Sequence, residues 1–306
     1  MFRLVLGIVI PLAIVGFFGI IYGRNTLHDM AQNNARAINA LKSQSMLQWL
    51  EERKQDVEGI AHSQKMGEVL SIIETPTNTP KQRDEAMSFL SDDLRDVPKK
   101  EHASISSISI FDLDTNMTLV RVPVGIGMDQ SGNNDLISAA KTKTVVEERY
   151  DPVTKANMIV VATPIVIAGM PHAIFFAETE LDNFLSIAKN QTGLEAGGES
   201  YILDMNGRNI ALQKDASESD AGGSSKIATP FVQHLLVEQA ANPSGIFETS
   251  IGKNANTIVA YNTLSTGWIL VTEIPNTQFL SIVNWPLLII LLFVAIILAG
   301  FIAIVN

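Results

Sequence analysis

The stretch "SISIFDLDTNMTLV" at 107–120 alternates apolar and polar residues, passes through an acidic turn and then becomes apolar again. Alternation of period two is typical of a half-buried β-strand, so the stretch predicts two strands joined by a turn. A second stretch of the same kind, "SYILDMNGRNIAL", occupies 200–212, and its Asn-Gly pair is a strong hairpin signal. We therefore predict similar strand pairs at two places in the chain.

Further segments repeat in the same order after each of these stretches. "KANMIVVATPI" at 155–165 resembles "NANTIVAYNTL" at 254–264, and "AIFFAETELDNFL" at 173–185 resembles "WILVTEIPNTQFL" at 268–280. Self-similarity in a fixed order is the mark of a duplicated structural unit. The pattern indicates two copies of one module built from helices and strands.

The segment before the strands is predicted to be helical. Residues 26–74 contain no Pro and only two Gly, and apolar or small residues recur every three or four positions. The expected buried face comprises Ala31, Ala35, Ile38, Leu41, Ser45 and Trp49. Such a helix either packs on its own domain or pairs through its lower half with a second copy of the chain.

A shorter helix is expected after Pro76, with Thr79 as N-cap and Pro80 in the first turn. Pro98 is expected to stop it.

Both ends of the chain carry long apolar runs. Leu4 to Tyr22 and Leu287 to Val305 contain no charged residue, and about 19 helical residues cover most of a ~30 Å hydrocarbon core. We expect two membrane helices. A cleaved signal peptide is the alternative for the first run, but the run is long and "GFFGIIYG" lacks an A-x-A-like cleavage site. Two crossings would place residues 24–284 on the outer side of the membrane.

Composition excludes several classes of function. The net charge is -10, which is unsuited to nucleic acid, and the chain has no cysteine for a disulfide, an iron–sulfur cluster or a thiolate zinc site. The five His are widely separated, and no nucleotide-binding or hydrolase motif occurs. We expect no enzymatic activity, no cofactor and no metal.

This layout resembles the double Cache sensor domains of bacterial chemoreceptors, sensor kinases and cyclic-di-GMP enzymes. The resemblance is carried by "TVVEERYDPVTKANMIVVATPI" in the first module, and by "QTGLEAGGESYILDMNGR" and "AYNTLSTGWILVTEIP" in the second. It implies an α+β fold in which a long N-terminal helix precedes two PAS-like antiparallel-sheet modules, flanked by two transmembrane helices. The implied boundaries are 1–23 for the first membrane helix, 24–98 for the ascending and short helices, 99–192 for the membrane-distal module, 193–282 for the membrane-proximal module and 283–306 for the second membrane helix.

The resemblance also implies a function and a site. The chain is expected to sense an extracytoplasmic small molecule as the input half of a homodimeric receptor in the bacterial inner membrane, with an output domain after Asn306. The expected ligand-binding residues, in the distal module, are Phe111, Arg121, Arg149, Tyr150, Asp151, Phe175 and Glu178. Glu178 would hold an amine, and the arginines would receive a carboxylate.

Other interpretations of these residues stay open. The Arg-x-Trp-Tyr pattern of the amino-acid-binding subgroup is absent, which argues against free amino acids as the ligand. Residues 149–152 are also typical of an ordinary strand end, and Glu178 could face water. Phe111, Phe175 and Phe176 are more typical of the core. A complete ectodomain that docks an envelope protein is the alternative function.

Overall fold

The computed structural model describes residues 2–75, 77–97, 105–123, 133–151, 156–194, 198–210, 230–249 and 257–275. The helices are α1 (Phe2–Ala61), α2 (Gln64–Glu74), α3 (Pro80–Arg95), α4 (Asn134–Ala140), α5 (Asp182–Lys189) and α6 (Pro230–Ala241). The strands are β1 (Ile105–Asp112), β2 (Met117–Val122), β3 (Val145–Asp151), β4 (Ala156–Ile167), β5 (Met170–Glu180), β6 (Glu199–Leu203), β7 (Ser244–Thr249), β8 (Thr257–Thr263) and β9 (Ile269–Pro275). The chain is therefore α+β, with a long N-terminal helix followed by antiparallel sheets, as expected.

The strands form two antiparallel sheets with a common order. The five-stranded sheet runs β2-β1-β5-β4-β3, and the four-stranded sheet runs β6-β9-β8-β7. Without the edge strand β2, each strand of the first sheet has a counterpart at the same place in the second. The repeated sequence segments occupy these matching places, since 155–165 and 254–264 contribute to β4 and β8, and 173–185 and 268–280 to β5 and β9.

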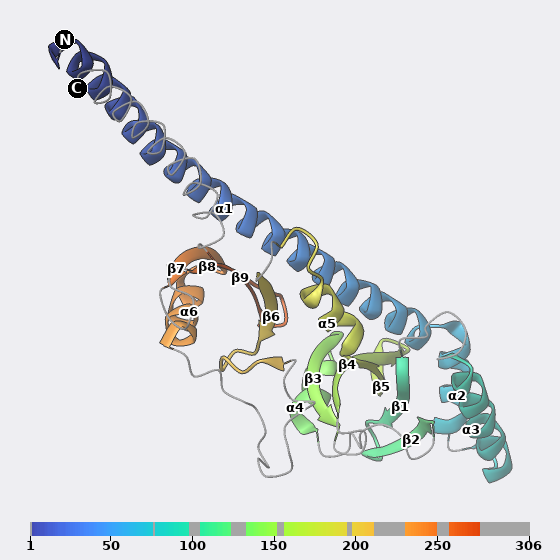
Figure 1. Cartoon of the computed structure of the whole chain (residues 1–306). Coiled ribbons are helices and arrows are strands. Elements are labelled where there is room, and N and C mark those ends of the chain that lie inside the picture. Colours follow the sequence, from blue (N-terminus) through green and yellow to red (C-terminus); the bar gives the residue numbers. More distant parts are fainter. Residues whose placement is uncertain are drawn as a thin grey trace.

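Helix α1 lies along one side of both sheets (Figure 1). It has 60 residues, so at 1.5 Å per residue it is about 90 Å long. Its part from Ala31 to Ile38 packs on the four-stranded sheet, and its later part, from Met46 onward, joins the core of the five-stranded sheet. The two sheets therefore share one helical support.

The predicted continuous helix to Glu74 is wrong, because the chain breaks at His62 and Ser63 and restarts as α2. Ser63 adopts an extended conformation, and its side chain accepts a hydrogen bond from the backbone N–H of Met66 at 3.3 Å. A serine in this role satisfies a backbone donor that a helix start leaves without a partner. The predicted cap of α3 is confirmed, since Thr79 and Gln82 form a capping box and Pro80 opens the helix.

The buried face of α1 differs in part from the prediction. Ala31, Ala35 and Ile38 are buried as expected, but Leu41 is 65 % exposed. Asn39 and Lys42 are buried in its place because they bond to the sheet and to α5. A polar residue can occupy an interface when its hydrogen bonds are made there.

Two polar side chains fix α1 against the four-stranded sheet. The Asn39 amide donates to the carbonyls of Ala260 and Leu270 and to the Thr272 hydroxyl at 3.0–3.2 Å. The Lys42 ammonium donates to the carbonyl of Ala188 and to Ser200 Oγ, both at 2.9 Å. Burial lowers the pKa of Lys42 from 10.5 to about 8.

An aromatic contact joins the two halves of the molecule. Phe184 of α5 lies 5.5 Å from Trp49 of α1 and 5.3 Å from Trp268, which directly precedes β9, between ring centroids. Residues of both sheets belong to the same apolar cluster around it. The sheets are therefore packed against each other as well as against α1.

The two predicted membrane segments are not equally covered by the described residues, since α1 includes only the first, 1–23, from Phe2 onward. Within the described residues, no helix combines the length and the apolar character needed to cross a membrane. The second predicted segment, 283–306, lies outside the described residues.

Candidate functional site

The five-stranded sheet has two different faces. One face packs on α1, α2 and α3 through Ile108, Ile110 and Phe175. The other face packs on α4 through an apolar cluster that includes Phe111, Phe176 and the helix residues Leu136, Ile137 and Ala140. In an antiparallel sheet, residues directly opposite each other point to the same side, so the strand register assigns each predicted ligand residue to a face.

Glu178 of β5 lies on the face that α4 covers. It is opposite Ser107 of β1 and Val160 of β4, and Val160 is opposite Glu147 of β3. Glu178 is 2 % exposed, so it does not face water. Ser107 Oγ donates a hydrogen bond to Glu178 Oε2 at 2.5 Å. A buried carboxylate accepts charge-assisted hydrogen bonds, which are stronger than those between neutral groups.

We call a set of residues that lie opposite one another across the strands a row. The row next to that of Glu178 contains Arg121. It is opposite Ser109, which is opposite Phe176, and the row continues to Ala162 and Val145. Phe176 is fully buried on this face, and Phe111 of β1 lies two positions beyond Ser109 on the same side. Arg121 therefore shares a face with Glu178, on a neighbouring row.

The row on the other side of Glu178 contains Arg149. Arg149 of β3 is opposite Met158, which is opposite Glu180. Its guanidinium forms an ion pair with Glu147 at 3.3 Å, and its Nε is buried and makes no hydrogen bond to any described residue. Tyr150 and Asp151 follow in β3, opposite Asn157 and Ala156, but the directions of their side chains lie outside what the structure describes.

Phe175 lies on the other face of the sheet. It pairs with Ile110 and Thr163 and belongs to the cluster against α1, on the opposite face from Glu178. Alternation along β5 requires this, because Phe175 and Phe176 are adjacent. The structure therefore places Phe111, Arg121, Arg149 and Glu178 on one face of the sheet, with Arg121 and Arg149 on its two edge strands, and Phe175 on the other face.

The prediction missed Ser107, Ser109 and Glu147, which lie in the same rows as the predicted residues. The alternation in "SISIF" was the available signal, because it places both serines on the side of Phe111. Carboxylates, guanidinium groups and hydroxyls on one partly apolar face suit a small molecule that carries both an ammonium and a carboxylate group.

The four-stranded sheet has a glutamate at the place that matches Glu178. Glu273 of β9 is opposite Val259 of β8 and Glu199 of β6, and the Tyr201 hydroxyl donates to its Oε1. Burial raises the pKa of Glu273, although the hydrogen bond from Tyr201 opposes the shift. Helix α6 covers this face through Phe231, Val232 and Leu235, as α4 covers the first sheet. The duplication thus includes a glutamate in the corresponding strand of each sheet, Glu178 in β5 and Glu273 in β9.

No family model and no curated protein sequence matches this chain. Solved structures do match. The ligand-binding domain of the Pseudomonas fluorescens chemoreceptor CtaA, in complex with L-isoleucine, is 14% identical with a TM-score of 0.55, over 85% of this chain and 98% of that chain. The ligand-binding domain of Mlp24 with asparagine is 16% identical with a TM-score of 0.56, over 86% and 99%.

The sensory domain of the Campylobacter jejuni chemoreceptor Tlp3, with isoleucine bound, is 9% identical with a TM-score of 0.57, over 84% of this chain and 98% of that chain. At these identities the likeness concerns the fold. The chain has the fold of chemoreceptor ligand-binding domains, and those neighbours bind amino acids.

Proposed function

We propose that this chain is the sensory part of a bacterial transmembrane receptor, and that it binds a small amine- or carboxylate-bearing metabolite on the α4 face of its five-stranded sheet. The observation that carries the proposal is buried Glu178, held by Ser107 in the row between those of Arg121 and Arg149. The fold shared with chemoreceptor ligand-binding domains supports a sensory role over a catalytic one.

The chemistry of the face favours a ligand of mixed charge. Glu178 supplies an acceptor for an ammonium group, and Arg149 supplies a buried Nε donor for a carboxylate. Amino acids have both groups, as do the ligands of the solved neighbours. Because this chain lacks the Arg-x-Trp-Tyr pattern, we propose that its ligand is a related amine or carboxylate metabolite in place of a common free amino acid.

The proposed topology places both apolar end segments in the bacterial inner membrane, with residues 24–284 outside the cytoplasm. The apolar runs Leu4–Tyr22 and Leu287–Val305 support this arrangement. A homodimer and a cytoplasmic output domain beyond Asn306 complete the proposal. A ligand would act by binding one arrangement of the membrane helices more tightly than another.

The test is a thermal-shift and calorimetric screen of a fragment of residues 24–282 with amino acids, polyamines and short carboxylates. We expect at least one class to raise the melting temperature. Glu178→Gln should then weaken binding of an amine ligand by about tenfold or more, because a charged hydrogen-bond acceptor is lost. Glu85→Gln, at an exposed position of α3, is the matched control.

A folded fragment that responds to none of these compounds would contradict the proposal. So would a ligand whose affinity is the same for the wild type and for Glu178→Gln and Arg149→Met.

A further inference from the structure

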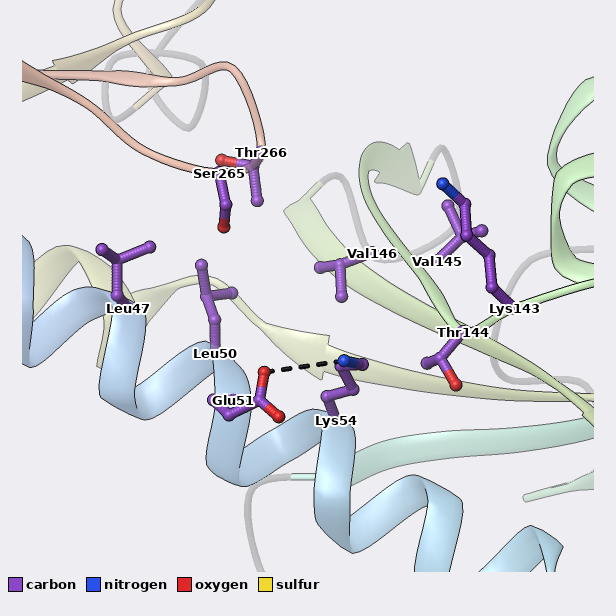
Figure 2. A pocket seen from close by; sticks show the side chains of 10 residues that line it. All are labelled: Leu47, Leu50, Glu51, Lys54, Lys143, Thr144, Val145, Val146, Ser265 and Thr266. Carbon is purple, nitrogen blue, oxygen red and sulfur yellow. Dashed lines mark ion pairs between the residues drawn. The ribbon is translucent and has the colours of Figure 1, made fainter. Parts of the chain in front are cut away.

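A cleft with a volume of about 400 Å³ lies where α1, the start of β3 and the turn between β8 and β9 meet (Figure 2). Its size is within the range of small-molecule sites in proteins. The lining residues are Leu47, Leu50, Glu51 and Lys54 of α1, Lys143, Thr144, Val145 and Val146 at the start of β3, and Ser265 and Thr266 of the turn. None of the residues predicted to bind ligand is among them.

One part of the cleft is apolar. Leu47 and Leu50 project from α1, and Val145 and Val146 come from the first two residues of β3. Leu50 is 6 % exposed and belongs to the main apolar cluster, with Leu47 and Val146 packed against that cluster. This wall can accept a short hydrocarbon group and remove it from water.

The polar part of the cleft has an excess of positive charge. Lys54 forms an ion pair with Glu51 at 3.6 Å, which is long for an ion pair. Lys143 forms no ion pair or hydrogen bond with any described residue. The lining thus carries two lysines and one glutamate, and a second carboxylate, that of Glu58, accepts a hydrogen bond from Thr144 at the edge of the cleft.

Hydroxyl groups supply further donors. Ser265 and Thr266 line the side formed by the second sheet (Figure 2). The remaining nearby hydroxyl, that of Thr144, already donates to Glu58 of α1 and contacts Thr163 at 2.9 Å. This bond holds the start of β3 against α1, so the cleft has a fixed wall at that end.

We propose that this cleft binds a small amphipathic monoanion, a short-chain carboxylate with its hydrocarbon part against Leu47, Leu50 and Val146 and its carboxylate between Lys54 and Lys143. A bound anion would contact α1 and both sheets at once. Apart from Val145, which lies in the row of Phe176, the lining residues do not belong to the α4 face of the five-stranded sheet.

The test is isothermal titration of the full chain in nanodiscs with butyrate, and with butylamine as a probe of equal length and opposite charge. We expect saturable binding of butyrate and none of butylamine. Lys143→Met and Lys54→Met should each weaken butyrate binding by about tenfold, the effect of losing one charge-assisted hydrogen bond. Lys141→Met, an exposed lysine two residues away that does not line the cleft, should bind like the wild type.

Three results would overturn the proposal. The first is the absence of butyrate binding to a chain whose circular dichroism shows it to be folded. The second is binding that survives the double substitution of Lys54 and Lys143. The third is inorganic phosphate binding more tightly than butyrate, because the apolar wall would then play no part. The substitutions of Lys54 and Lys143 leave the α4 face intact, so a loss of butyrate binding in these variants identifies the cleft and is distinguishable from a failure of the proposed function.

Discussion

The contact between the two sheets contains a carboxyl group, Glu148, whose ionisation should weaken the folded state. Glu148 of β3 is opposite Ile159, so it points to the side of α1 and away from the α4 face. Burial, and to a smaller extent the charge of Asp204, raise its pKa from 4.5 to about 7, against an opposing effect of Arg208. Asp204 and Arg208 belong to the turn after β6 and are joined by an ion pair at 2.6 Å. The charge on Glu148 is therefore unfavourable where the two sheets meet.

The effect on stability has a definite sign and size. Between about pH 4.5 and pH 7 the folded chain binds more protons than the unfolded chain, so the free energy of unfolding decreases as the pH rises through this window. The pKa values of Glu148 in the folded and unfolded chains differ by about 2.5. At about 1.36 kcal/mol per pKa unit, this lowers the free energy of unfolding by at most about 3.4 kcal/mol. Because the side chain is only partly buried, screening by solvent should reduce this to about 2 kcal/mol.

The assay is urea unfolding of residues 24–282 at several pH values, followed by circular dichroism. Glu148→Gln has no charge to develop, so its stability relative to the wild type should increase by about 2 kcal/mol from pH 4.5 to pH 7. Glu85→Gln, at an exposed position of α3 away from this contact, is the control for the loss of one carboxyl group. If wild type and Glu148→Gln keep a constant difference across this window, the carboxyl is not destabilised at the contact.

Three further substitutions test the packing, each by urea unfolding of the same fragment. Asn39→Leu removes the amide that bonds three acceptors of the four-stranded sheet and should cost about 2 kcal/mol; an unchanged midpoint would show that these bonds contribute nothing. Gly207→Ala should cost roughly 1–3 kcal/mol, because φ is +76° and the new Cβ would lie 2.5 Å from Val232 Cγ1; a stabilised variant would contradict this. Phe184→Ala should cost about 3–5 kcal/mol by opening a cavity between Trp49 and Trp268, and a loss below 1 kcal/mol would mean that the sheets do not share a core there.

Local signals in the sequence predicted the local structure well. The cap at Thr79 and Pro80 could be identified because it depends on a few adjacent residues. The break before α2 could not, since Ser63 occurs in a segment whose composition is helical throughout. The exposed side of α1 was also misjudged at Leu41, because Asn39 and Lys42 are buried only by virtue of partners far along the chain.

The candidate site was predictable to the extent that it follows strand alternation. Glu178, Phe176 and Phe111 share a face for that reason, and the same rule excludes Phe175. The cleft between the sheets had no sequence signal, because its lining comes from three segments that only the folded chain brings together.

The bonds of Asn39 and Lys42 also bear on how the chain reaches its folded state. Their partners, including Ala188 and Leu270, lie 146 to 233 residues later in the sequence. During synthesis, this part of α1 is made well before the strands that satisfy it, and contacts of such long sequence separation form slowly. A chain that ends before β9 would leave the Asn39 amide without Leu270 and Thr272. The N-terminal helix thus depends for its final position on β9, a strand that is made more than 200 residues later.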